Sequence, residues 1–123
     1  MKHVGDITRI RGDEIPVVDC ITGGSPCQDL SIAGKRAGLA GERSGLFMEQ
    51  MRVIKEMRKK ERDSGRIGSN IRPRYMVWEN VPGAFSSGKP KGSDFAAVIE
   101  EIIKVCEPDA DVHVCIPNNG WTK

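Results

Sequence analysis

The sequence has few aromatic residues, few histidines and no long apolar run. Aromatic side chains make up 5% of the 123 residues, and there are 2 histidines. No apolar stretch approaches the roughly 20 residues that a membrane-spanning helix needs, and the N-terminus has no apolar stretch of signal-peptide length. These absences argue against a membrane protein or a secreted product. We expect a cytoplasmic protein with the length of one small domain.

The 4 cysteines form no C-x-x-C pair, and their spacing to His113 matches no zinc pattern, so no metal site is predicted. Cys20, Cys106 and Cys115 lie among valine and isoleucine residues, which predicts small buried side chains. Cys27 lies instead in a Gly/Pro loop, outside any periodic apolar pattern. A cysteine placed in this way is accessible to a substrate.

The net charge of +2 conceals an uneven distribution. Residues 34–75 carry 12 basic and 5 acidic side chains, a net charge of +7, so the rest of the chain carries −5. A solvated helix face is one interpretation of such a segment. The other is a surface that binds phosphate groups.

Apolar periodicity predicts an alternation of strands and helices. Short β-rich runs indicate buried strands, apolar residues at helical spacing indicate amphipathic helices, and the polar segment 61–73 is predicted to be a mobile loop. The expected strands cover residues 17–22, 75–78 and 111–116, with a strand end at 4–7, and the expected helices cover 46–60 and, from a cap at Ser93 or Asp94, the run to Cys106.

This order predicts an α/β fold with a parallel sheet. In such sheets the ligand lies beyond the carboxyl ends of the strands. Asp6, Cys27 and Glu79 lie at or just after three expected strand ends. A thiolate at Cys27 can add to an electron-poor ring carbon while the Glu79 carboxyl stabilises charge on a ring nitrogen. The residues therefore indicate thiol chemistry on a nucleobase, with the long loop 25–44 as a functional segment.

Four motifs in order carry a family resemblance. Pro26-Cys27-Gln28 resembles the catalytic motif of DNA cytosine-5 methyltransferases, and Glu79-Asn80-Val81 resembles their Glu-Asn-Val motif. Gly5-Asp6-Ile7 is similar to the family's cofactor-contacting segment. Gly38-Leu39, followed by Arg43-Ser44-Gly45-Leu46-Phe47, is similar to the next family block. The resemblance covers residues 4 to about 106.

The resemblance implies a partial Rossmann-like methyltransferase fold with a mostly parallel sheet. The reaction it implies is methyl transfer from S-adenosylmethionine to carbon five of a cytosine flipped out of double-stranded DNA. Cys27 would attack ring carbon six, Glu79 would hydrogen-bond ring nitrogen three, and the catalytic loop would be 25–44. The other implied contacts are Asp6, Ile7, Pro26 and Leu46 with the cofactor, and Gln28, Ser31, Lys35, Arg36 and Arg43 with DNA.

The sequence also departs from the family. It has no glycine-rich cofactor motif, no Gln-x-Arg-x-Arg motif and no target-recognition domain. We therefore expect residues 1–123 to be an interior fragment of a catalytic domain, incomplete at both ends of its sheet. Such a fragment is expected to be inactive alone, to bind the cofactor weakly or not at all, and to associate with itself or with a complementing chain through exposed sheet edges. A non-catalytic nucleic-acid-binding fragment and one half of a split enzyme stay open as alternatives.

Overall fold

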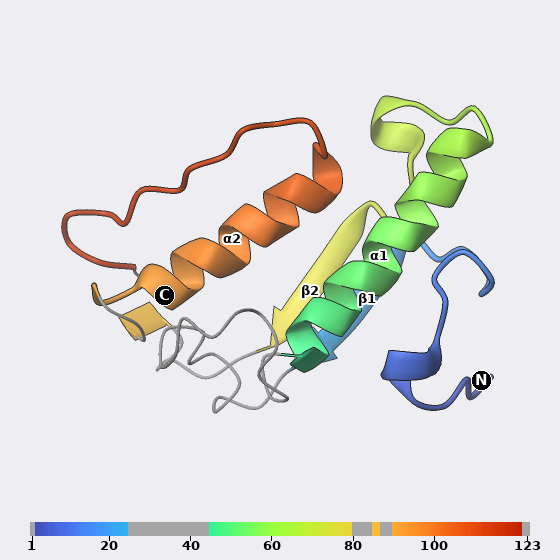
Figure 1. Ribbon diagram of the computed structural model, residues 1–123, viewed down its shortest axis with the longest axis horizontal. Helices are drawn as coiled ribbons and strands as arrows, with labels where there is room; N and C mark the ends of the chain where they lie inside the picture. Colours follow the sequence, from blue (N-terminus) through green and yellow to red (C-terminus); the bar gives the residue numbers. More distant parts are fainter. Residues whose placement is uncertain (1, 25–44, 80–84, 87–89, 122–123) are drawn as a thin grey trace. The chain divides into compact units, whose positions relative to one another are not determined.

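The computed structural model describes residues 2–24, 45–79, 85–86 and 90–121, and of residues 45 and 46 it describes the backbone (Figure 1). The chain divides into two compact units. The first holds Met1–Gly24 and Met48–Glu79, and the second holds Ser25–Phe47 and Asn80–Lys123. None of the helices among the described residues is long and apolar enough to cross a membrane.

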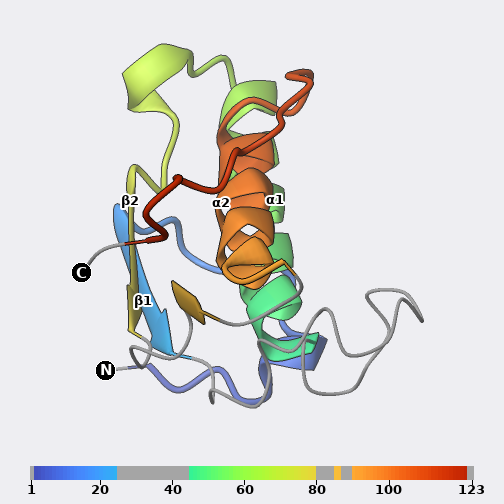
Figure 2. The same ribbon diagram turned by 90° about the vertical axis from the view of Figure 1, so that its left-hand side faces the viewer.

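The first unit is built on two parallel strands. β1 (Cys20–Gly24) pairs with β2 (Tyr75–Glu79). A parallel pair needs a long crossover connection, and α1 (Gly45–Asp63) lies within it. Alternate residues of both strands are half-buried, and Figure 2 shows α1 along one face of the sheet. The predicted α/β class and its parallel pairing are confirmed, and the Rossmann-like completion of the sheet stays a prediction.

α1 forms where the apolar residues recur at helical spacing. Met51, Ile54 and Met57 fall three residues apart, and they are 3%, 5% and 0% exposed. The helix continues three residues beyond the predicted end. It closes with a Schellman motif, in which Arg66 N–H donates to the Glu61 carbonyl and Gly65 N–H to the Arg62 carbonyl. Gly65 takes the left-handed φ of 96° that this ending requires.

The segment after α1 contains the 3-10 helix η4 (Gly68–Asn70) and is attached to α1 by buried polar side chains. Arg58 Nη1 donates to the carbonyl oxygens of Ile71 and Pro73 at 2.9 and 2.6 Å. Arg72 pairs with Glu61, which is 5% exposed. The predicted mobility of residues 61–73 stays a prediction.

The second unit contains α2 (Ser93–Cys106). The predicted caps were Ser93 or Asp94, but the N-cap is Gly92, with a φ of 89° and no side-chain hydrogen bond. Trp121 Nε1 donates to the Gly92 carbonyl at 2.9 Å, and a Cβ on this glycine would lie 2.9 Å from the indole ring. The approach of the ring therefore requires glycine at the cap.

The third strand predicted over residues 111–116 does not form. Burial alternates as predicted, with Val112, Val114 and Ile116 half-buried. However, Val114 N–H donates to Glu100 Oε1 at 2.9 Å, so a helix carboxylate satisfies a donor that a strand would use in a sheet. The expected strand end at 4–7 is also wrong, because the 3-10 helix η1 (Ile7–Arg9) begins there.

The prediction that three cysteines are buried is wrong, since Cys20, Cys106 and Cys115 are all exposed. Cys20 lies on the face of β1 opposite the half-buried Ile21. Cys106 is the last residue of α2, and Cys115 lies between the half-buried Val114 and Ile116. Valine and isoleucine neighbours therefore indicate the element but not the side of it on which a cysteine lies.

Candidate active site

The carboxyl ends of β1 and β2 lie at the same edge of the sheet. The parallel register places Gly24 opposite Glu79, the last residue of each strand. Glu79 is exposed. Cys27 follows Gly24 by three residues and lies outside the described residues. The register thus brings the predicted carboxylate to the strand end from which the predicted nucleophile's loop leaves.

Close backbone packing marks this strand end. A Cβ placed on Gly24 would lie 3.2 Å from the Glu79 carbonyl oxygen and 3.7 Å from the Glu79 Cβ. On the other face, a Cβ on Gly23 would lie 2.6 Å from the amide Nε2 of Gln50, a residue of α1. The two glycines in succession therefore let the backbone of Glu79 lie close beside the end of β1 and let α1 lie close over one face of it.

Asp6 and Ile7 lie at the start of η1, in the same unit. Asp6 Oδ1 accepts hydrogen bonds from the backbone N–H and the hydroxyl of Thr8, both at 2.9 Å. These bonds, the backbone one first, hold the pKa of Asp6 below its ordinary value of 3.8, so the carboxylate is ionised at neutral pH. No hydrogen bond or ion pair among the described residues joins Asp6 to Glu79.

The remaining predicted site residues lie largely outside the described part of the chain. Leu46 is in the first turn of α1, in the second unit, and only its backbone is described. Within the described residues, no group of three His, Cys, Asp or Glu side chains could hold a metal ion. The predicted site residues that lie outside the described part of the chain are Pro26, Cys27, Gln28, Ser31, Lys35, Arg36 and Arg43.

The family model for C-5 cytosine-specific DNA methylases matches residues 1–105. The chain belongs to this family. It is 50% identical over 112 residues to the type II methyltransferase M1.ScrFI of Lactococcus lactis subsp. cremoris, a match that covers 91% of this chain and 24% of the relative. No solved structure matches the methylase chain at a significant level.

Two phage proteins are also similar to the methylase chain. The orphan methyltransferase M.Rho11sI of Bacillus phage rho11s is 35% identical over 87 residues, which cover 71% of this chain and 14% of that protein. A protein of Escherichia phage P1 named DNA N-6-adenine-methyltransferase is 37% identical over 91 residues, 71% of this chain and 11% of that protein. The methylase chain therefore spans between about a tenth and a quarter of the length of these relatives.

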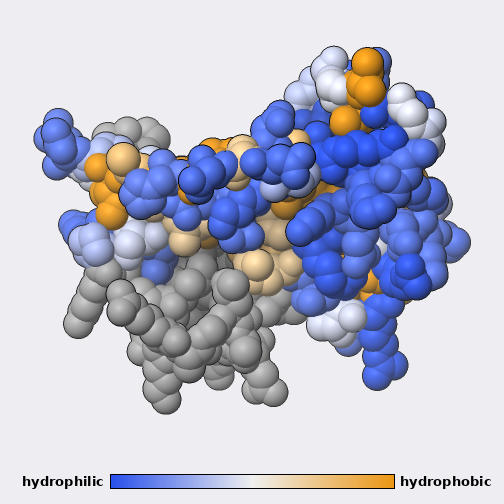
Figure 3. All heavy atoms as spheres, turned by 45° about the horizontal axis from the view of Figure 1, so that its top comes forward, coloured by the Kyte–Doolittle hydropathy of each residue, from blue (hydrophilic) through white to orange (hydrophobic). Residues whose placement is uncertain are grey.

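Several basic side chains of the segment 34–75 form ion pairs where the structure describes it. Glu61 accepts ion pairs from Arg66 and Arg72, and Asp19 pairs with Arg74. The right-hand part of Figure 3, which carries α1 and the segment after it, is mostly hydrophilic. Residues 45–75 nevertheless carry 9 basic and 4 acidic side chains, a net charge of +5, and the phosphate contacts of the loop residues stay a prediction.

Sequence reasoning missed the polar anchors beneath η1. Arg52, in α1, donates to the Ile7 carbonyl at 2.9 Å, and Glu56 accepts the Gly12 N–H at 2.7 Å. The spacing of Glu49, Arg52 and Glu56 is visible in the sequence as helical ion pairs. Nothing local, however, indicates a backbone partner 45 residues away.

Proposed function

We propose that this chain is the catalytic segment of a DNA cytosine-5 methyltransferase of a restriction–modification system. The observation that carries the proposal is the pairing of Gly24 with Glu79 at one edge of a parallel sheet. This register places the Glu-Asn-Val carboxylate at the end of the strand that leads to Pro26-Cys27-Gln28. The family match over residues 1–105 supports the same assignment.

In the proposed reaction, Cys27 and Glu79 act on one cytosine flipped out of double-stranded DNA. The Cys27 thiolate forms a bond to ring carbon six, and the electron pair moves toward carbon five and nitrogen three. The Glu79 carboxyl hydrogen-bonds nitrogen three and stabilises the charge that develops there. After methylation, a base takes the proton from carbon five, the electron pair of that bond restores the double bond between carbons five and six, and the sulfur–carbon bond breaks, which frees the Cys27 thiolate.

S-adenosylmethionine, when bound, supplies the methyl group. Asp6 fits its adenine end chemically, because Oδ1 is taken by Thr8 while Oδ2 remains an exposed, ionised acceptor for an amino group. The N–H of Ile7 opens η1 and so has no partner within that helix. Pro26 and Leu46 are proposed to contact the rest of the cofactor.

The proposed DNA contacts lie in the catalytic loop, residues 25–44. Gln28 and Ser31 contact DNA near the flipped base, and the loop's basic side chains contact phosphates, which steers and strengthens binding in a salt-dependent way. We propose that this chain alone is inactive, because it spans at most 24% of the relatives named above. The proposed phosphate contacts are Lys35, Arg36 and Arg43.

The name of the phage P1 relative raises adenine methylation as a second reaction. The amino group of adenine is itself a nucleophile and needs no enzyme thiol. Pro26-Cys27-Gln28 followed by Glu79-Asn80-Val81 therefore favours cytosine, since a cysteine and a carboxylate together serve ring addition. A non-catalytic DNA-binding segment would instead bind DNA in a salt-dependent way that Cys27→Ser leaves unchanged.

A chimera tests the proposal. This chain replaces the matching segment of the Lactococcus relative, and labelled methyl incorporation into DNA is measured. We expect activity that falls about 10³-fold or more in Cys27→Ser, whereas Cys20→Ser, a change at an exposed cysteine, has little effect.

DNA with 5-fluorocytosine should trap the Cys27 adduct, because fluorine at carbon five prevents proton loss. An active chimera that keeps its rate in Cys27→Ser would contradict the proposal, and mixing separate halves tests the split-enzyme alternative.

A further inference from the structure

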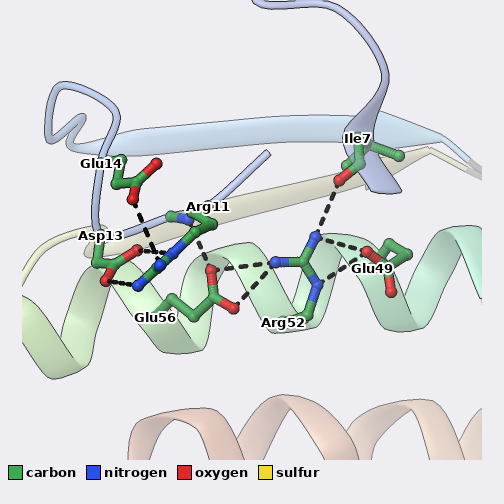
Figure 4. A network of polar contacts seen from close by, with 8 residues as sticks. Ile7, Arg11, Asp13, Glu14, Glu49, Arg52 and Glu56 are labelled. Carbon is green, nitrogen blue, oxygen red and sulfur yellow. Dashed lines mark hydrogen bonds and ion pairs between the residues drawn. The ribbon is translucent and has the colours of Figure 1, made fainter. Parts of the chain in front are cut away.

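Arg52 reaches from α1 to the backbone of the predicted cofactor segment. Its Nη2 donates to the Ile7 carbonyl oxygen at 2.9 Å. Its Nε donates to Glu49 at 2.8 Å and its Nη1 to Glu56 at 2.9 Å, so two carboxylates hold the guanidinium in orientation (Figure 4). The Arg52 side chain is 31% exposed. The planar fork of an arginine satisfies three partners in fixed directions, which a lysine cannot do.

A second anchor holds the same segment five residues later. Glu56 Oε2 accepts the Gly12 N–H at 2.7 Å as well as a bond from Arg52 Nη1 at 3.1 Å. The backbone lies so close to α1 here that a Cβ on Gly12 would be 2.1 Å from the Val53 carbonyl oxygen. Arg52 and Glu56 are therefore a hydrogen-bonded pair that anchors the segment at Ile7 and at Gly12.

η1 begins at the first of these two anchored positions and ends before the second. It is three residues long, and its internal support is the Asp6 cap with the bonds from Arg9 to Asp6 and from Ile10 to Ile7. None of its residues is buried. A 3-10 turn this short is not stable by itself in water. Its conformation, and hence the direction of the Asp6 carboxylate and the Ile7 N–H, depends on the anchors from α1.

We propose that Arg52 is a positioning residue that presents Asp6 and Ile7 to the adenine end of S-adenosylmethionine. The inference rests on the proposed function, which assigns the cofactor contact to Asp6 and Ile7. Arg52 acts through the main chain of Ile7 and not by touching the ligand. The ion pairs with Glu49 and Glu56 orient the guanidinium toward that carbonyl.

The experiment has two readouts. Amide hydrogen exchange in the full 123-residue chain follows the N–H groups of Thr8, Arg9 and Ile10. Saturation transfer to the adenine protons of S-adenosylmethionine follows the ligand, and it is measured in the chimera with the Lactococcus relative because the chain alone is expected to bind the cofactor weakly or not at all. In Arg52→Gln we expect exchange at these amides to accelerate about 10-fold or more and the transfer to adenine to fall. In Arg52→Lys, which keeps the charge, we expect a smaller change of both.

Arg11→Gln is the matched control. Arg11 lies in the same segment and pairs with Asp13 and Glu14, but its side chain is 61% exposed and it does not bind the Ile7 carbonyl (Figure 4). We expect neither readout to change there. The Val53 amide, inside α1, reports whether a variant keeps the helix.

The outcomes separate the inference from the proposed function. Unchanged exchange at Thr8, Arg9 and Ile10 in Arg52→Gln would overturn the role of Arg52, whatever the ligand does. Equal effects of Arg11→Gln and Arg52→Gln would overturn it too, because the loss of one positive charge would then explain both effects. Accelerated exchange in Arg52→Gln with unchanged transfer to adenine in the same variant of the chimera would instead overturn the cofactor contact of Asp6 and Ile7, while the anchoring by Arg52 would stand.

Discussion

Gly24 and Glu79 are register partners at the last position of two parallel strands, and the Glu79 side chain is exposed. This pairing predicts that Glu79 serves chemistry and not stability. In the chimera, Glu79→Gln should lower methyl transfer about 10²- to 10⁴-fold, the range of a lost acid–base group. The free energy of unfolding should change by less than about 0.5 kcal/mol, as for other exposed substitutions.

The control for this prediction is Glu14→Gln, another exposed glutamate in the first unit. It should change neither methyl transfer nor the urea midpoint. If Glu79→Gln kept full activity, or if it lost activity only in proportion to stability, the assignment of Glu79 to the reaction would be wrong.

Much of this fold could be predicted because apolar periodicity is local. α2 ends at the predicted Cys106, β2 extends one residue beyond the predicted 75–78, and α1 differs by one residue at its start and three at its end. The bounds predicted for the first strand are wrong at both ends, since β1 covers Cys20–Gly24 and not residues 17–22. The end of α1 depends on a Schellman motif at Gly65, a backbone conformation that apolar spacing does not encode. Residues 111–116 show why alternation alone is insufficient, since it specifies two faces but not a neighbouring strand.

The position of Glu79 at a strand end could be predicted, whereas the side chains that anchor the candidate cofactor segment could not. Glu79 could be placed at a strand end because the apolar run stops there, and the register with Gly24 agrees. Arg52 could be predicted only as a partner of Glu49 and Glu56. Its bond to Ile7 joins residues 45 apart, and such a contact depends on how η1 lies against α1.

Gly12 is predicted to be the glycine of the first unit least tolerant of alanine. A Cβ there would meet the Val53 carbonyl oxygen at 2.1 Å, so two backbones would have to separate and the Gly12–Glu56 hydrogen bond would weaken. We expect Gly12→Ala to lower the free energy of unfolding by about 3 kcal/mol, the upper end of the usual overpacking cost. Urea unfolding followed by circular dichroism measures it.

Gly24→Ala is the comparison for Gly12→Ala. Its Cβ would lie 3.2 Å from the Glu79 carbonyl oxygen, a contact that small shifts relieve. The loss should be below about 1 kcal/mol. A loss in Gly12→Ala as small as the one expected for Gly24→Ala would show that the approach of Gly12 to α1 is looser than the structure has it.

Glu61 is predicted to make stability depend on acid pH. It is 5% exposed, and the hydrogen bond from Arg72, assisted by the charge of Arg66, holds its pKa below the ordinary value of 4.5. A carboxyl with a lower pKa in the folded state stabilises the fold fully above 4.5 and loses that contribution as the pH falls through the folded-state pKa. The urea concentration at the unfolding midpoint should therefore decrease as the pH is lowered below 4.5.

Glu61→Gln should weaken this dependence while lowering stability at pH 7, because Arg66 and Arg72 lose the carboxylate with which they pair. Asp63→Asn is the matched change, since Asp63 pairs with Lys59 on an exposed surface and their side chains are 63% and 72% exposed. Its pH profile should follow that of the unmodified chain. A Glu61→Gln profile as steep as the unmodified one would assign the acid sensitivity to other carboxyls.

The exposed face of the sheet is predicted to mediate self-association. Tyr75 and Val77 are 61% and 55% exposed, and the register places them beside Cys20 and Thr22 on the face away from Gln50. Burying a valine side chain contributes roughly 1.5 kcal/mol. Val77→Lys should therefore raise the dissociation constant about tenfold or more, measured by sedimentation velocity across a concentration series.

Ile67→Lys is the matched control, because Ile67 is 76% exposed and lies outside the sheet, so the same change of residue type should leave association intact. A chain that sediments as a monomer at every concentration would refute association through this face, and equal effects of the two lysine variants would attribute it to general surface hydrophobicity.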